Sequence, residues 1–192
     1  MLDLTNEEKI IMATISCIEK YGIHRTTIRQ IGQEAGVNSA AISYYFRSKD
    51  ALIQRALDIA LNNAFDIENF KDSIGLPISE RLISVFEGMT IGSIKFPNLT
   101  RAFLSGLFTS TDDDAPVVRK LHAFLDILRD EILEARPEKS GAEIKRLLMQ
   151  LSCATFLFPS IFQQFFKGFP EIDLTDDAIR STYIRELVNK LL

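Results

Sequence analysis

The sequence contains few of the residues on which disulfide scaffolds, metal sites and thiol enzymes depend. Its 192 residues include two cysteines, two histidines and no tryptophan. Cys17 and Cys153 lie far apart, and neither a Cys-x-x-Cys motif nor zinc-ligand spacing is present. We therefore expect no metal and no cofactor. Both cysteines are interpreted as small buried side chains, with a redox role for Cys153 left open.

Proline, glycine and long apolar runs are also scarce. Six prolines and nine glycines are too few for a collagen-like or disordered chain, and 46% apolar residues suffice for a core without disulfides. The first residues lack a basic segment leading into an apolar one, so no signal peptide is predicted. The most apolar stretch, residues 153–166, is shorter than a bilayer span. We expect a soluble, cytoplasmic protein without a membrane partner.

The charge of the chain is unevenly distributed. Within a net charge of −4, residues 24–49 carry four cations and one acid, Glu34, a balance of +3 that leaves −7 elsewhere. A basic segment on an acidic body suits contact with phosphates through one surface. Ordinary solvated surfaces also carry clusters of this size, so charge alone does not decide. The four cations are Arg25, Arg29, Arg47 and Lys49.

Apolar residues recur at helical spacing along the chain, and strand-like alternation is hard to find. The pattern predicts an all-α protein of about nine helices without a sheet. Thr5 or Asn6 is a plausible N-cap for the first helix, and Pro159 should kink the eighth. The predicted helices cover about residues 6–21, 27–34, 38–46, 48–65, 77–95, 97–109, 116–136, 142–166 and 176–192.

The aromatic residues suggest two domains. Phe46 is the only phenylalanine before Phe65, whereas three of the four tyrosines lie in the first 50 residues. We predict a small N-terminal module at residues 1–48 and a larger, Phe-rich helical body at 49–192.

Residues 26–49 carry the most informative pattern. Two short predicted helices flank Ala35-Gly36-Val37, which has the dimensions of a helix-turn-helix, and Gly36 can take the positive φ of its turn. The outer face of the second of these helices has small or hydrogen-bonding side chains, as a helix in the roughly 12 Å wide major groove requires. These side chains are Asn38, Ser39, Ala40, Ser43 and Tyr44.

Over residues 6–55 the sequence resembles the DNA-binding domain of the TetR/AcrR family of bacterial transcriptional regulators. The motifs that carry the resemblance are Thr26-Thr27-x-Arg29-x-Ile31, Ala35-Gly36-Val37 and Tyr45-Phe46-x-Ser48-Lys49-x-x-Leu52. The remaining residues match the family only in length and helical character.

The resemblance implies a role for each matching residue. Thr26 or Thr27 would hold a phosphate, and Arg29 would reach the DNA backbone or a base edge. Four positions of the recognition helix would face bases: Asn38, Ser39, Ala40 and Ser43. Three positions would contact phosphates: Tyr44, Tyr45 and Lys49, although a core role for Tyr45 stays open.

The recognition helix departs from the common family pattern. Ser39-Ala40-Ala41 stands where Lys-Gly-Thr is frequent, and Ser43 stands where Tyr is frequent. We therefore expect base recognition through short side chains, van der Waals contact and bridging water.

For the body, the resemblance implies a homodimer on a palindromic operator, with residues 142–166 and 176–192 of each subunit forming a four-helix interface. Burial of these helices within one subunit is the alternative. The resemblance also implies a repressor that a small, largely apolar effector releases by swinging the fourth helix. The candidates for the pocket wall, for each of which plain core is the more common role, are Phe65, Phe86, Met89, Phe103, Phe108, Phe124, Met149 and Phe156.

Three other functions stay open at this point. The first is a DNA-binding regulator controlled by a protein partner, without an effector. The second is an all-helical enzyme with an apolar cavity, although we find no nucleophile–base pair, glycine-rich phosphate loop or paired carboxylates. The third, a helical interaction module, leaves the basic segment unexplained.

Overall fold

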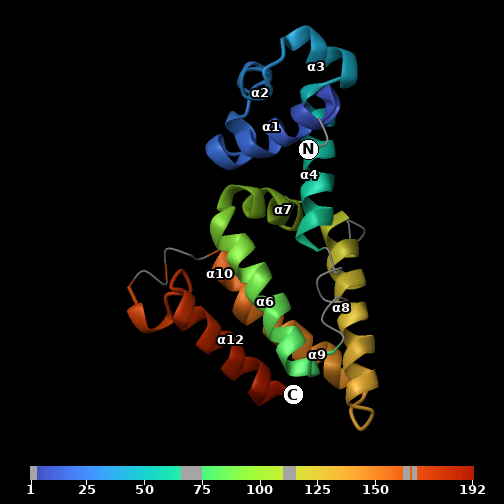
Figure 1. Ribbon diagram of the computed structural model, residues 1–192, viewed down its shortest axis with the longest axis vertical. Helices are drawn as coiled ribbons and strands as arrows, with labels where there is room; N and C mark the ends of the chain where they lie inside the picture. The colour runs from blue at the N-terminus through green and yellow to red at the C-terminus, as the bar shows by residue number, and fades with distance from the viewer. Residues whose placement is uncertain (1–3, 66–74, 110–115, 162–164, 166–167) are drawn as a thin grey trace. The chain divides into compact units, whose positions relative to one another are not determined.

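The computed structural model describes residues 4–65, 75–109, 116–161, 165 and 168–192, and over these residues the chain is helical without a β-strand (Figure 1). The predicted all-α fold class is confirmed. The elements are α1 (Asn6–Tyr21), the 3-10 turn η1 (Ile23–Arg25), α2 (Ile28–Ala35), α3 (Ser39–Tyr45), α4 (Lys49–Ala64), α6 (Ile78–Lys95), α7 (Pro97–Thr109), α8 (Pro116–Ala135), α9 (Gly141–Ser152), the π-helical turn η2 (Cys153–Leu157), α10 (Phe158–Ile161), the 3-10 turn η3 (Pro170–Ile172) and α12 (Asp177–Leu191).

Side-chain caps explain where several helices begin. Thr5, rather than Asn6, caps α1: its hydroxyl accepts the Glu8 N–H at 3.2 Å, and the Glu8 carboxylate accepts the Thr5 N–H at 2.8 Å. The Ser140 hydroxyl caps α9, and the Asp176 carboxylate accepts two N–H bonds at the start of α12. Each of these caps satisfies N–H groups that the first turn of a helix leaves without a partner.

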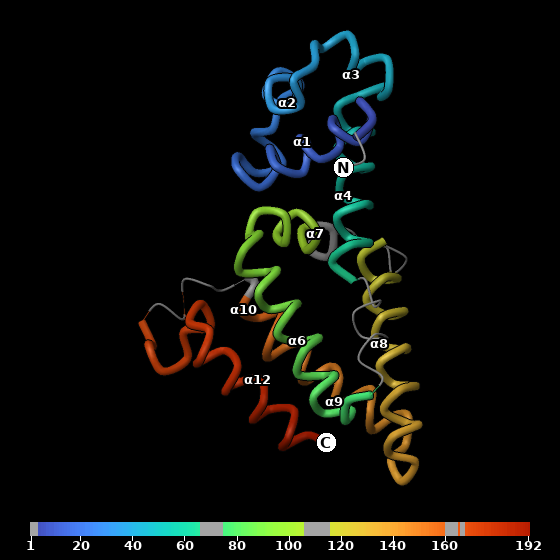
Figure 2. Tube along the Cα trace, viewed as in Figure 1, coloured from blue at the N-terminus to red at the C-terminus, as the bar shows by residue number. Residues whose placement is uncertain are grey.

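The contacts divide the chain into two compact units, Met1–Asn63 with Phe96–Val117 and Ala64–Lys95 with Val118–Leu192. The first contains α1 to α4 and α7, and the second contains α6, almost all of α8, and α9 to α12, as the chain trace in Figure 2 allows the reader to follow. This division does not coincide with a boundary at residue 48, because α4 and α7 pack with α1. The functional domain boundary stays a prediction.

The first unit is built on two apolar clusters. One joins α1, α2, α3 and the start of α4, with Ile31, Ile42 and Leu52 fully buried. The other joins α1, α4 and α7 through Ile18, Ile53 and Leu99. The α1 helix therefore contributes to both clusters and connects them.

The second unit has one larger core, to which α6, α8, α9 and α12 contribute. Ile184 and Val188 of α12 are fully buried in it. Tyr183, Leu187 and Leu191 of α12, which lies in the segment 176–192 expected at a dimer interface, pack partly against the same core. Burial within one subunit, the alternative stated above, therefore accounts for these three side chains.

Near Pro159, where a kink was expected, the helix contains the π-helical turn η2. This turn ends at Leu157, and Pro159 lies in α10, which follows. Proline has no N–H, so Pro159 cannot donate to the carbonyl of Thr155 four residues earlier or to that of Ala154 five residues earlier. The Thr90 hydroxyl of α6 shares its proton between the Thr155 carbonyl at 2.8 Å and the Phe86 carbonyl of its own helix at 2.6 Å. The Tyr183 hydroxyl of α12 donates to the Ala154 carbonyl at 3.3 Å. Two neighbouring helices thus supply the missing hydrogen bonds.

The substitution Thr90→Val should lower the free energy of unfolding by about 1–3 kcal/mol, because it removes the hydroxyl donor from a buried carbonyl. Thr14→Val is the matched control. Thr14 is equally buried, but its hydroxyl donates to the Ile10 carbonyl within its own helix, where a backbone donor remains. Chemical denaturation of both variants measures the difference, and equal losses would contradict the role given to Thr90.

Candidate nucleic-acid interface

Helices α2 and α3 form the expected helix-turn-helix. Gly36, in the turn, has φ +69° and ψ 28°, the left-handed conformation that side chains disfavour. Its N–H and the N–H of Val37 both donate to the Gly32 carbonyl, the latter at 2.9 Å. A Cβ added at Gly32 would lie 2.8 Å from the Val37 carbonyl oxygen, so the turn passes very close to α2.

The inner faces of this module are apolar, as predicted. Ile28, Val37 and Phe46 are partly buried against the cluster that contains Ile31 and Ile42. Cys17 is buried in the same cluster, in agreement with its interpretation as a small apolar side chain, and burial raises the pKa of its thiol. The packing determines which face of α3 points away from the module.

The outward face of α3 is exposed. Ser39, Ala40 and Ser43 are exposed on it, and the Tyr44 side chain is 84% exposed. The helix carries no charged residue between its ends, so the close approach of its backbone to a base pair meets no charged side chain. This arrangement fits recognition through short side chains.

Two polar groups of α3 already have intramolecular hydrogen bonds. The Asn38 Oδ1 accepts the Ala41 N–H at 2.9 Å as the N-cap, so a base contact from Asn38 has to use its NH₂ group. The Ser43 hydroxyl donates to the Ser39 carbonyl at 3.0 Å, which leaves its oxygen as an acceptor. In the major groove, the donors that this Ser43 oxygen could accept are the amino groups of adenine and cytosine.

Tyr44 and Tyr45 contact each other at the end of α3. Their ring centroids lie 5.2 Å apart with planes at 87°, an edge-to-face pair. Tyr45 is 40% exposed, which favours a surface position over the core alternative. Lys49 follows as the first residue of α4, whose N-cap is Ser48, the acceptor for the Ala51 N–H at 3.1 Å.

Of the two threonines before α2, Thr27 is the exposed one. It caps the helix: its hydroxyl accepts the Gln30 N–H at 3.3 Å, and the Gln30 side chain accepts the Thr27 N–H. Of the two predicted alternatives for the phosphate contact, Thr27 is therefore the one that its exposure favours over Thr26. Thr26 is fully buried, and its hydroxyl donates to the Gly22 carbonyl at 2.9 Å.

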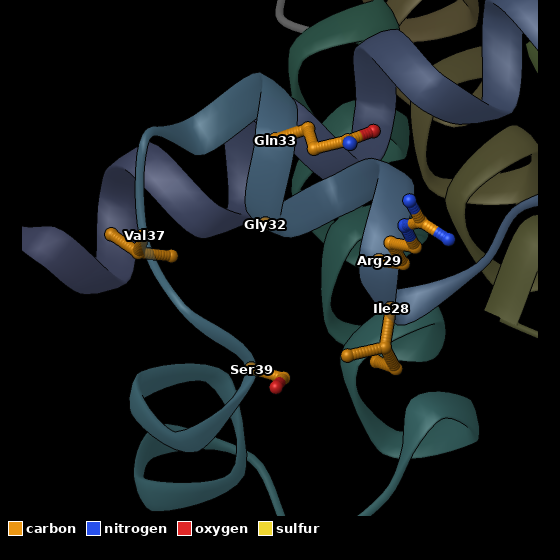
Figure 3. Close-up of a pocket in the computed structure, with 6 residues that line it drawn as sticks. All are labelled: Ile28, Arg29, Gly32, Gln33, Val37 and Ser39. Atoms are coloured by element: carbon orange, nitrogen blue, oxygen red, sulfur yellow. The ribbon is translucent and has the colours of Figure 1, made fainter.

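Arg29 is exposed near the start of α2 and lines an open groove of about 530 Å³ between α2 and α3. The other lining residues are Ile28, Gly32, Gln33, Val37 and Ser39 (Figure 3). Figure 3 shows the Gln33 and Arg29 side chains on the same side of α2. Gln33 was not among the predicted contact residues, although its position one turn after Arg29 places both side chains on one face of a helix.

An ion pair neutralises the single acid of the basic segment. The Glu34 carboxylate accepts from Lys20 Nζ at 2.6 Å and from the Ser16 hydroxyl at 2.8 Å. These hydrogen bonds lower the pKa of Glu34 below its usual value, and the bond to Glu34 raises the pKa of Lys20. Glu34 is therefore ionised and paired at neutral pH, so the cations of the segment dominate its field.

The expected effector wall is partly assembled in the second unit. Phe86 and Phe124 are buried core residues, and Met89 and Phe65 pack against them. The Phe65 ring lies 5.6 Å from the ring of Phe124 and 6.3 Å from that of Phe156, between centroids. This aromatic group stays the predicted pocket wall.

Two members of the expected wall lie elsewhere. Met149 is 50% exposed, because it projects from the face of α9 beside the one that buries Leu148 and Leu151. Phe103 packs in the first unit, against the cluster of α1, α4 and α7. The side chain of Phe108 lies outside the described residues. Cys153 is exposed rather than buried, with its sulfur 3.9 Å from that of Met149.

No three His, Cys, Asp or Glu side chains among the described residues are grouped so that they could bind a metal ion. None of the helices in the described part of the chain combines the length and the apolar character needed to cross a membrane.

Comparison with known proteins agrees with this geometry. The family model described as "Bacterial regulatory proteins, tetR family" matches residues 10–56. The HTH-type transcriptional regulator BetI of Pectobacterium carotovorum subsp. carotovorum (strain PC1) is 26% identical over 117 residues, 61% of this chain and 52% of BetI. BetI of Escherichia coli (strain K12 / DH10B) is 41% identical over 49 residues, 26% of this chain and 25% of BetI. The chain thus spans about half or less of the length of these curated relatives.

Solved structures share the fold over nearly the whole chain. A transcriptional regulator from Rhodococcus sp. Rha1 has a TM-score of 0.67 at 14% identity, covering 98% of this chain and 96% of the other. FadR from Bacillus subtilis, in complex with stearoyl-CoA, has a TM-score of 0.67 at 17% identity. The match covers 96% of this chain and 98% of FadR. SCO4454, a TetR-family transcriptional regulator from Streptomyces coelicolor, has a TM-score of 0.63 at 21% identity. The match covers 97% of this chain and 93% of SCO4454. At these identities the likeness concerns the fold.

The two threonines should respond differently to substitution. Thr27→Ala should weaken binding to duplex DNA severalfold and destabilise α2 by about 1 kcal/mol, because the exposed cap is lost. Thr26→Val should leave DNA affinity unchanged, since the Gly22 carbonyl keeps its backbone donors. Anisotropy titrations on labelled duplexes at fixed salt measure both. A loss of affinity in Thr26→Val, with its fold intact, would restore the phosphate role to Thr26.

Proposed function

We propose that the chain is a transcriptional repressor of the TetR family, whose family model matches residues 10–56, and that it binds operator DNA through α3 and is released by a small apolar effector. The proposal includes a cytoplasmic location, where such DNA is found. One observation carries it: α3 presents an exposed, uncharged face of short side chains, held outward by a buried apolar cluster and flanked by cations.

The cations and the uncharged face of α3 would contact different parts of the DNA. Arg29 and Lys49, on α2 and α4, would hold phosphates on either side of the groove, while Tyr44 adds a hydroxyl at the end of α3. Base edges would then meet Ser39, Ala40 and Ser43. Because these side chains are short, base contacts need a close approach of α3 or bridging water.

We propose that the protein acts as a homodimer on a palindrome, since one short recognition helix reads few base pairs. Tyr183, Leu187 and Leu191 of α12 pack partly against the core of their own subunit, so the interface would also use another face. The exposed side chains of Met149 and Cys153, at the end of α9, support a contact there. The dimer interface would then combine α9 with the polar face of α12.

The effector proposal rests on the aromatic group of the second unit. Phe65, Phe124 and Phe156 supply an apolar wall suited to an aromatic or aliphatic ligand. The FadR structure in complex with stearoyl-CoA supports the capacity of this fold to hold a ligand with a long apolar chain. The ligand would release DNA only if it binds the non-binding conformation, with α4 displaced, more tightly than the binding one.

Two alternatives differ in testable ways. A regulator controlled by a protein partner would bind the same operator but would not respond to a small molecule. An enzyme with an apolar cavity would not select a DNA sequence. Selection of bound duplexes from a random pool separates the two classes: a palindrome supports the proposal, and a pool without enrichment contradicts it.

Replacement of Tyr44 or Lys49 by Ala should weaken binding to all duplexes about equally. Lys49→Ala should also reduce the slope of log K against log salt by about one unit, because one phosphate contact and its released counterion are lost. Titrations at four salt concentrations measure this slope. Binding of either variant with wild-type affinity and slope would remove that residue from the phosphate contacts.

Substitutions of Ser39 and Ser43 should change sequence preference instead. Ser43→Ala removes the acceptor oxygen and should reduce discrimination at one base pair by about fivefold to a hundredfold, the range of a good base contact. Repeating the duplex selection with each variant shows which position of the site relaxes. An unchanged selected site would exclude that serine from base recognition.

A further inference from the structure

A reciprocal set of hydrogen bonds joins α1 of the helix-turn-helix module to the start of α7. The first-turn N–H groups of α7 have no acceptor inside the helix, and Phe96, which precedes it, has no side-chain oxygen to cap them. The Glu19 carboxylate of α1 supplies the acceptor: its Oε2 lies 3.0 Å from the Leu99 nitrogen and its Oε1 lies 3.4 Å from the Asn98 nitrogen. A carboxylate is also the favoured charge at a helix N-terminus.

The bond in the other direction comes from Asn98. Its Nδ2 donates to the Glu19 main-chain carbonyl at 2.8 Å, in the last turn of α1, where helix carbonyls lack partners of their own. Arg101 Nη1 donates to Asn98 Oδ1 at 3.0 Å, which orients the amide for this bond. The end of α1 and the start of α7 thus satisfy each other's polar groups.

Apolar residues next to Glu19 and Asn98 pack together and support the hydrogen bonds between α1 and α7. Ile18, next to Glu19, and Leu99, next to Asn98, are buried in the cluster that α1 shares with α4 and α7. Figures 1 and 2 show α7 beside α1 in this unit. The contact therefore combines a charged hydrogen bond with burial on both sides.

The position of this contact along the chain gives it a consequence. The α6 helix ends at Lys95 and α7 begins at Pro97, so a single residue, Phe96, links α6 to the helix that Glu19 holds. The Thr100 N–H and hydroxyl both donate to the Phe96 carbonyl, at 3.0 and 2.9 Å, and so close the first turn of α7. A displacement of Phe96 would act on the Asn98 and Leu99 N–H groups that Glu19 binds, because both follow it in the first turn of α7.

We infer that Glu19 is a positioning residue: with Asn98 it fixes the helix-turn-helix module to α7 and thereby sets the spacing between the two recognition helices of the dimer. This inference rests on the proposed function. It predicts that Glu19 governs which half-site spacing is bound and leaves the affinity for one half-site alone, because its carboxylate points to α7 rather than to the outer face of α3.

The test varies the spacing of the selected palindrome by one and two base pairs, since each inserted pair rotates one half-site by roughly 34°. Wild-type protein should bind its preferred spacing about tenfold or more tightly than the altered ones. Glu19→Ala should lose most of this discrimination while its affinity for an isolated half-site stays within about twofold. Glu7→Ala, which removes an exposed carboxylate from the same helix, is the charge-matched control and should keep the wild-type profile.

Glu19→Gln, which retains an acceptor oxygen without the charge, should fall between the wild type and Glu19→Ala. Asn98→Ala keeps the carboxylate cap, loses only the reciprocal bond, and carries the same test if Glu19→Ala does not fold. An unchanged spacing profile in folded variants would overturn the inference, as would an equal loss on every duplex and half-site. Selective binding by wild type without a spacing preference would also overturn it and leave DNA binding intact. No selective binding by wild type would overturn the proposed function as well.

Discussion

The orientation of α3 depends on one small apolar cluster. Ile31, Ile42 and Leu52, from three successive helices, are fully buried in it. The cluster is compact because the turn at Gly36 takes a left-handed conformation and brings α3 against α2. Every inference about DNA depends on this packing, because it decides which side chains of α3 remain outside.

Local signals in the sequence were sufficient for much of the fold. Helical periodicity indicated the all-α class, and Thr5 marked the start of the first helix because a cap acts within a few residues of itself. The exposed face of α3 also followed from periodicity, because its small and polar side chains recur on one side of the helix. These features depend on neighbours three or four residues away, which a single sequence displays.

The errors arose where burial depends on distant segments. Thr26 and Thr27 have the same chemistry, but only the backbone after Gly22 decides that Thr26 turns inward. Likewise, Met149 is as apolar as its neighbour Leu148, and only the packing of α9 onto the core separates them. The contact between Glu19 and α7 joins residues about eighty positions apart, so no periodicity could indicate it.

The absence of charge between the ends of α3 has a consequence for how such a protein can diverge. Cations on neighbouring helices supply the attraction common to all DNA, whereas neutral, short side chains confront the bases. The strength of attachment and the choice of target are thus encoded at different positions. Successive exchanges among serine, alanine and similar residues could redirect the protein to a new regulatory site while its general hold on the double helix is preserved.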